Sequence, residues 1–399
     1  MTVSRRQIID ESSRVARGAA LVGIAVIGLA TAALAQPGSG SNSSSAPAPS
    51  SFPSIVRGYS SPTPAVPAAT AQEATARRIL EGQVRALGAA FSGDIGIAVR
   101  DVQSGWTTSY DGDTYFPQQS VSKFWVALTA LDKADRGELS LDAPVTVRRD
   151  DMTLFHQPIA AQLGSSGYNT TLNTLIYRAI TQSDNTCNDF VLWKSGGPSA
   201  VRDFLRSRGI EGIRFGPGER LLQSQIAGIE WRQSYAYNGG FYKARAAVPA
   251  AQRRAAFERY IADPMDGATP NGIVDALSRL KRGELLSPAS TQKLLSIMGN
   301  TKTGAQRLKG GLSAGWRLSH KTGTGQVLGG EQAGYNDIGI LTGPDGRSYA
   351  VAVMIRRTSA PLGHRMAAMQ NTVRAVISFD QNMTSYGMAR YGSAEQGSR

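Results

Sequence analysis

The chain has 399 residues, of which 41% are hydrophobic and 18% are charged, a composition typical of a soluble globular protein with a sizeable core. Cys187 is the only cysteine, which excludes an intramolecular disulfide. The formal net charge is +13, but there is no lysine- or arginine-rich block and no nucleic-acid motif. We therefore expect no nucleic-acid partner and instead anionic surfaces or anionic substrates.

Residues 1–35 have the order of an export signal. Several arginines precede an uncharged, mostly apolar run over 18–32, and the small-residue sequence Ala33-Leu34-Ala35 follows it. We expect this signal peptide to be cleaved, so that the mature protein is a periplasmic or secreted monomer without a stable membrane anchor. Residues 36–71 are rich in Ser, Pro, Gly and Ala and predict a flexible linker.

The sequence then predicts a catalytic domain over 72–380, followed by a disordered tail over 381–399. Apolar residues spaced three and four apart predict a helix over 72–90, and alternation predicts strands over 95–102 and 106–110. Further helices are predicted over 120–136, 172–181, 185–194, 199–208, 272–280 and 288–298. Strands over 316–320, 337–342 and 349–355 and a helix over 366–377 close the domain. This order predicts an α+β fold, an antiparallel sheet covered by helices with an inserted all-helical subdomain.

Ser120 and Lys123 form an S-x-x-K motif where a polar turn enters an apolar helix. Residues three apart on a helix share a face, so the lysine lies beside the serine. A desolvated lysine can take the proton of a serine hydroxyl as the neutral amine and so make the serine a nucleophile. The motif alone is weak evidence, because Ser290-Thr291-Gln292-Lys293 has the same pattern.

Two further motifs follow in order, Ser183-Asp184-Asn185 and Lys321-Thr322-Gly323. Together the three resemble the signature of class A β-lactamases and penicillin-binding proteins. In chemical terms, Ser183 can relay a proton to the leaving nitrogen, Asn185 can hold a substrate amide, and Lys321 can attract a carboxylate. Thr322 adds a hydroxyl to that pocket. The backbone N–H groups of Ser120 and Thr324 are expected to form the oxyanion hole.

Class A β-lactamases also use a glutamate that deacylates the serine ester with a bound water, followed four residues later by an asparagine. The resemblance gives Glu219 the role of that glutamate, whereas Gln223 stands where the family has asparagine. Pro217-Gly218 replaces the usual Arg-Trp before it. The sequence thus predicts the base and leaves the placement of the water open.

Other positions depart from the same family or extend it. The stretch between Glu219 and Asp266 is longer than usual, and this insert, about 224–265, is rich in aromatic residues and arginines. We expect the insert to pack as a structural lid; a surface for peptidoglycan or bulky side chains is the alternative. Arg307 resembles the carboxylate-binding arginine of some carbapenem-hydrolysing relatives, and Phe155 resembles an aromatic residue at the site entrance.

The expected function is hydrolysis of a small-molecule β-lactam through a Ser120 acyl-enzyme, with no metal or cofactor. The three histidines have no HExxH or HxH spacing. One alternative is a D-alanyl-D-alanine carboxypeptidase or transpeptidase, because the same serine and lysines acylate peptides; a deacylating Glu219 would separate the two. The other is a non-catalytic cell-wall binding or sensor protein, which would need none of this acid–base chemistry.

Overall fold

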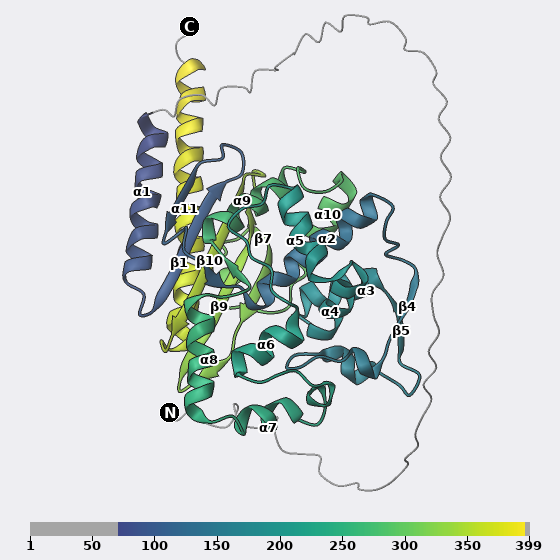
Figure 1. Cartoon of the computed structure of the whole chain (residues 1–399). Helices are drawn as coiled ribbons and strands as arrows, with labels where there is room; N and C mark the ends of the chain where they lie inside the picture. The colour runs from purple at the N-terminus through teal and green to yellow at the C-terminus, as the bar shows by residue number, and fades with distance from the viewer. Residues whose placement is uncertain (1–70, 396–399) are drawn as a thin grey trace, which may run out of the picture. The chain divides into compact units, whose positions relative to one another are not determined.

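The computed structural model describes residues 71–395, with side chains through Met383 (Figure 1). The predicted signal peptide and nearly all of the predicted linker lie outside the described residues. Within the described part, no helix has the length and apolar character needed to cross a membrane.

An antiparallel sheet forms the centre of the catalytic domain. Its strand order is β2 (Thr107–Tyr110), β1 (Asp94–Asp101), β10 (Ser348–Thr358), β9 (Glu331–Thr342) and β7 (Arg317–Thr324), and β8 (Val327–Leu328) pairs with β9. Successive side chains of a strand point to opposite faces. In β10, Val351 and Val353 enter one hydrophobic cluster while Ala350 and Ala352 enter the other, so both faces of the sheet are buried.

Two terminal helices cover one face of the sheet, where α1 (Ala71–Ala89) and α11 (Leu362–Glu395) lie side by side (Figure 1). Leu80 and Val84 of α1 and Val373 and Val376 of α11 are fully buried against it. Helix α11 continues into 381–395, where the sequence led us to expect a disordered tail. Phe379 and Met383 still pack on this cluster, which extends the apolar stripe beyond the predicted end at residue 377.

The other face carries the helical subdomain. Its main helices are α2 (Lys123–Asp135), α3 (Leu172–Thr181), α4 (Asn185–Lys194), α5 (Gly197–Ser207), α9 (Pro270–Lys281) and α10 (Pro288–Gly299). Four of them start directly after a residue whose side chain caps them. Each of these side chains accepts a hydrogen bond from a backbone N–H in the first turn, and the residues are Thr171, Asp184, Thr269 and Ser287. The predicted boundaries of these helices are confirmed to within a few residues, and those of α3 and α4 agree fully.

The insert contains α7 (Gly240–Ala246), α8 (Ala250–Ala262) and the 3₁₀ turn η4 (Gln233–Ala236), and it follows α6 (Glu219–Ala227). Phe257 and Ile261 of α8 pack on Leu222 and Ile226 of α6. Phe241 of α7 is buried in a second cluster. The insert therefore packs against the domain through these two clusters.

Shorter elements complete the described part of the chain. They are the strand pairs β3 (Phe116–Pro117) with β6 (Gly267–Ala268) and β4 (Pro144–Val147) with β5 (Tyr168–Thr171), and the 3₁₀ turns η1 (Gln119–Ser122), η2 (Arg149–Asp151), η3 (Pro158–Gln162) and η5 (Leu308–Gly311).

Candidate active site

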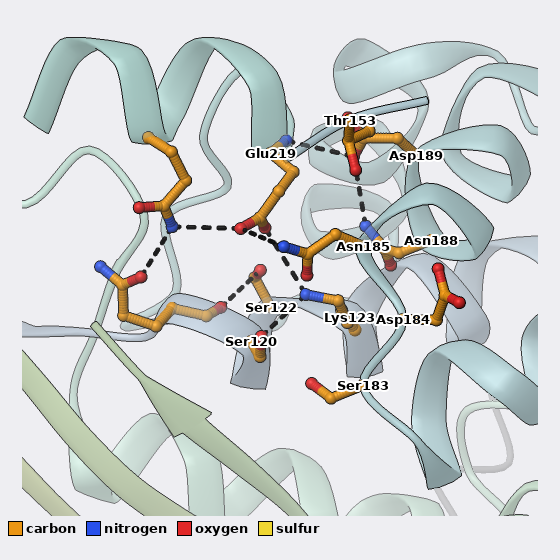
Figure 2. Close-up of polar contacts among 12 residues, drawn as sticks. Ser120, Ser122, Lys123, Thr153, Ser183, Asp184, Asn185, Asn188, Asp189 and Glu219 are labelled. Atoms are coloured by element: carbon orange, nitrogen blue, oxygen red, sulfur yellow. Dashed lines mark hydrogen bonds and ion pairs between the residues drawn. The ribbon is translucent and has the colours of Figure 1, made fainter. Parts of the chain in front are cut away.

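The predicted nucleophile lies in the turn η1, directly before α2. Lys123, the first residue of α2, donates from Nζ to Ser120 Oγ at 2.8 Å (Figure 2). Lys123 is 1% exposed, whereas Ser120 is only partly buried and lines a cleft. The residue before the serine, Gln119, has a left-handed backbone with φ of 54°. Such strain costs about 1–3 kcal/mol and persists only where surrounding contacts hold it.

The second serine and the second lysine also meet. Lys321 Nζ donates to Ser183 Oγ at 2.9 Å and to the carbonyl of Thr322 at 2.8 Å. Burial, reinforced by the charges of Lys123 and Arg307, holds the pKa of Lys321 well below its ordinary value. Ser183 has a φ of 60° and so is a second strained residue of the site. Lys321 does not itself line the cleft, but its Nζ contacts Ser183 and Thr322, which do.

The middle residue of the second motif is structural. Asp184 caps α4: Oδ1 accepts from the Cys187 N–H at 3.0 Å and Oδ2 accepts from the Ile159 N–H at 2.7 Å. This cap brings Asn185 to the first position of α4. The Asn185 amide nitrogen donates to the Leu154 carbonyl at 2.9 Å and to Glu219 Oε1 at 3.1 Å, which leaves its oxygen as the acceptor for a substrate N–H.

Glu219 joins the network of the nucleophile. Its Oε2 lies 3.5 Å from Lys123 Nζ, and Oε1 accepts from Asn185 and from Gln223 Nε2, each at 3.1 Å (Figure 2). Glu219 begins α6, and its own N–H donates to Asp189 Oδ1 at 3.1 Å. Burial, followed by the charge of Glu219, raises the pKa of Asp189 to about 6. Lys123, Asn185 and Gln223 thus hold the Glu219 carboxylate from three sides.

A chain of amides connects Gln223 to the insert. Gln223 Nε2 donates to Gln119 Oε1 at 2.8 Å, and Gln119 Nε2 donates to the Tyr260 hydroxyl. Tyr260 in turn donates to Asp266 Oδ1 at 2.9 Å, and Asp266 Oδ2 accepts the Gln119 backbone N–H at 2.7 Å. On the other side, Gln326 Nε2 donates to Gln223 Oε1 at 3.0 Å. Gln119, Gln326, Tyr260 and Asp266 were not identified as site residues from the sequence.

Arg307 binds the end of β7, the strand that carries the third motif. Its Nη1 donates to the carbonyls of Gly323 at 2.9 Å and Asn336 at 2.7 Å, and its Nη2 donates to Thr324 Oγ1 at 2.5 Å. Its guanidinium lies 3.8 Å from the ring centre of Tyr335. Arg307 and Thr324 both line the cleft, as does Thr322, whose hydroxyl lies 2.7 Å from that of Thr303.

Gly323 allows this strand to approach the nucleophile turn. A Cβ on Gly323 would lie 2.3 Å from the Gln118 carbonyl oxygen, so a side chain has no room there. The glycine of the third motif is thus a packing requirement, and the strand edge it carries reaches the turn that holds Ser120.

The cleft has a volume of about 390 Å³. Most of the predicted site residues line it, namely Ser120, Phe155, Ser183, Asn185, Glu219, Gln223, Arg307, Thr322 and Thr324, whereas Lys123, Lys321 and Gly323 lie directly behind it. Five lining residues were missed, His156, Arg245, Thr303, Gly325 and Gln326. Arg245 comes from the insert, where no motif could indicate it. Within 71–395, no group of three His, Cys, Asp or Glu side chains could hold a metal ion.

Comparison with known proteins agrees with this geometry. The profile of a family described as "Beta-lactamase enzyme family" matches residues 79–378. β-Lactamase L2 of Stenotrophomonas maltophilia is 32% identical over 256 residues, which cover 64% of this chain and 71% of that protein. The extended-spectrum β-lactamase PER-1 of Pseudomonas aeruginosa is 26% identical over 268 residues, or 66% and 75% of the two chains.

The solved structure of an ancestral class A β-lactamase matches with a TM-score of 0.59 and 30% identity, covering 75% of this chain and 99% of that one. TLA-3 extended-spectrum β-lactamase shares the fold, with a TM-score of 0.62 and 24% identity over 75% of this chain and 98% of that one. The predictions of family and of fold class are therefore confirmed. The chain belongs to the β-lactamase enzyme family and is a class A member of it.

Proposed function

We propose that this enzyme hydrolyses the amide of small-molecule β-lactams through an acyl-enzyme on Ser120. One observation carries the proposal: Lys123 Nζ lies 2.8 Å from Ser120 Oγ and 3.5 Å from Glu219 Oε2. The nucleophile therefore has an amine beside it to accept its proton, and a carboxylate beyond that amine to serve as a second base. As the neutral amine, Lys123 takes the hydroxyl proton while Ser120 Oγ attacks the β-lactam carbonyl. The N–H groups of Ser120 and Thr324 stabilise the oxyanion.

Ring opening then needs a proton on the leaving nitrogen. Ser183 supports that role because its hydroxyl accepts from Lys321 and can relay a proton into the cleft. The ring carboxylate would contact Thr322 and Thr324, with the Lys321 amine and the Arg307 guanidinium behind them. Asn185 would hold the side-chain amide of the substrate, and Phe155 would form the entrance.

Deacylation separates this function from the D-alanyl-D-alanine peptidase alternative. A water polarised by Glu219 attacks the Ser120 ester, and the enzyme turns over. Gln223 supports this step, since it holds Glu219 Oε1 at 3.1 Å in the position where the family has asparagine. A binding or sensor protein is disfavoured by the buried lysine beside each serine, because burying a cation costs free energy that simple binding does not require.

The experiment is intact-protein mass spectrometry of the mature enzyme with a penicillin and a cephalosporin, beside Glu219→Gln. We expect a transient adduct and hydrolysed product from the wild type, and a persistent adduct from the variant. Glu211→Gln, which changes an exposed glutamate outside the cleft, is the matched control and should behave as the wild type. A persistent adduct in the wild type would favour a penicillin-binding peptidase, and no adduct would refute Ser120 as nucleophile.

The cellular setting of the proposed function comes from the sequence. The export signal expected over 1–35, the linker over 36–71 and the net charge of +13 support an enzyme that acts in the periplasm or outside the cell, near an anionic envelope that includes peptidoglycan. It would act as a monomer without a membrane anchor. Fractionation of cells that express the full chain, with N-terminal sequencing of the mature protein, tests the export and the cleavage site.

A further inference from the structure

The insert contributes one cation to the active-site cleft. Arg245 is the penultimate residue of α7 and lines the same cleft as Ser120, Asn185 and Glu219. It is half-buried, whereas Lys243 on the same short helix is exposed and lies outside the cleft. The fold of the insert therefore places Arg245 at the cleft.

Protein contacts hold this side chain in place. Arg245 Nη1 donates to Gln326 Oε1 at 3.0 Å, and the Gln326 amide donates in turn to the Gln223 carbonyl at 2.9 Å. The guanidinium carbon lies 5.3 Å from the ring centre of Tyr242 and 6.0 Å from that of Phe155, within the range of cation–π attraction. A guanidinium that is already ordered loses little entropy when it binds a ligand.

Arg245 has no anionic partner among the residues that the structure describes. No Asp or Glu oxygen of that part lies within 4.0 Å of it, the limit for an ion pair. Burial and the nearby positive charge of Arg253 lower the pKa of Arg245. One N–H group is occupied by Gln326, and the remaining donors of the planar fork can bind an anion.

Arg245 lies at a different place in the cleft from Arg307, which is proposed to lie behind the ring carboxylate. Arg307 binds the end of β7 through Gly323 and Thr324, whereas Arg245 binds Gln326, beyond the end of that strand, and contacts Phe155. Since Phe155 and Asn185 lie on the wall proposed to receive the acylamino group, a second anion at Arg245 would belong to the acyl side chain.

We propose, resting on the proposed function, that Arg245 is a specificity residue that binds an anionic group on the acyl side chain, so that β-lactams with a side-chain carboxylate are a favoured substrate class. Carbenicillin and benzylpenicillin form a matched pair of probes, because carbenicillin is benzylpenicillin with one added carboxylate on the side-chain α-carbon. Only carbenicillin has a side-chain carboxylate that can form an ion pair with Arg245.

The test is kcat/KM for both penicillins with the wild type, Arg245→Gln, Arg245→Lys and the control Lys243→Gln. We expect Arg245→Gln to lower kcat/KM for carbenicillin roughly tenfold, mainly through KM, which is the size of one partly exposed charge-assisted hydrogen bond. The value for benzylpenicillin should change less than about twofold, and Arg245→Lys should retain part of the preference. Added salt should weaken the carbenicillin reaction of the wild type more than that of Arg245→Gln.

An equal loss for both penicillins would overturn the inference, since it would make Arg245 a support for Gln326 and Gln223; an unchanged ratio would overturn it as well. The same ratio can be measured on the acylation rate of Ser120 by mass spectrometry. If the wild type is acylated but does not turn over, the proposed function fails while the role of Arg245 is still decided by that ratio. If neither penicillin acylates Ser120, both fail.

Discussion

Removal of one hydroxyl behind the active site, in Tyr260→Phe, tests how the insert supports catalysis. Tyr260 and Asp266 are both buried, at 4% and 1% exposed. The hydroxyl donates to Asp266 at 2.9 Å and accepts from the Gln119 amide. Phenylalanine preserves the ring and its packing on α6, so the change isolates these two hydrogen bonds.

The expected loss of stability depends on pH. Burial, and then the charge of Glu219, raises the pKa of Asp266 to about 6, while the Tyr260 hydrogen bond opposes this rise. Because the unfolded value is about 3.9, the folded state holds more protons between these pH values, and its free energy of unfolding falls as pH rises through them. Tyr260→Phe raises the folded pKa further. The variant should therefore lose about 2–3 kcal/mol at pH 8, where the bond is to a carboxylate, and about 1 kcal/mol at pH 5.

The same substitution should slow deacylation. Asp266 and Tyr260 together hold the left-handed Gln119, and Gln119 holds Gln223, which contacts Glu219. A small displacement of a catalytic group can cost up to about a hundredfold in rate, so we expect deacylation to slow by about tenfold to a hundredfold, with acyl-enzyme accumulating.

The assay combines urea unfolding at pH 5 and pH 8 with the lifetime of the penicillin adduct by mass spectrometry. Tyr349→Phe is the matched control, because Tyr349 is 1% exposed and donates to Asp380 at 2.7 Å in the cluster on the opposite face of the sheet. It should lose stability and keep its deacylation rate. A Tyr260→Phe enzyme with normal adduct lifetime, or one whose stability loss is the same at both pH values, would refute the reasoning.

Two further substitutions test the third motif. Lys321→Met should raise the melting temperature by a few degrees, because it removes a buried amine whose charged form is disfavoured by burial and by Lys123. The value of kcat/KM should fall at least about a hundredfold, and a lower melting temperature would contradict the reasoning. Gly323→Ala should cost about 1–3 kcal/mol in unfolding free energy and most of the activity, since its Cβ would meet the Gln118 carbonyl at 2.3 Å; full activity would show that the turn moves freely.

The sequence was sufficient for those parts of the site where chemistry restricts residue choice. The structure brings the serines and lysines of the three motifs together, with Lys123 at 2.8 Å from Ser120, as the spacing predicts, and Lys321 at 2.9 Å from Ser183. Glu219 lies beside them although the residues around it depart from the family pattern. Helix boundaries were predictable where a side chain caps the first turn, as at Asp184.

Two of the three glutamines of the site, Gln119 and Gln326, could not be predicted, because an amide that links two elements leaves no pattern in the sequence. Gln119, Gln223 and Gln326 lie on three separate segments that only the packing of the fold brings together. The end of α11 was missed for a related reason: the contacts of Phe379 and Met383 with the sheet decide it, and the polar composition after residue 380 obscures them.

The insert shows why a packed segment need not be only a structural lid. It supplies Tyr260 behind the nucleophile turn and Arg245 in the wall of the cleft, and both reach Gln223, the first through Gln119 and the second through Gln326. We expect the two contacts to act on different steps, because Tyr260 supports the position of Glu219 through Gln119 and Gln223, whereas Arg245 is proposed to bind the substrate. The variants Tyr260→Phe and Arg245→Gln test the two contacts separately: the first should change the lifetime of the acyl-enzyme, and the second the ratio of kcat/KM between the two penicillins.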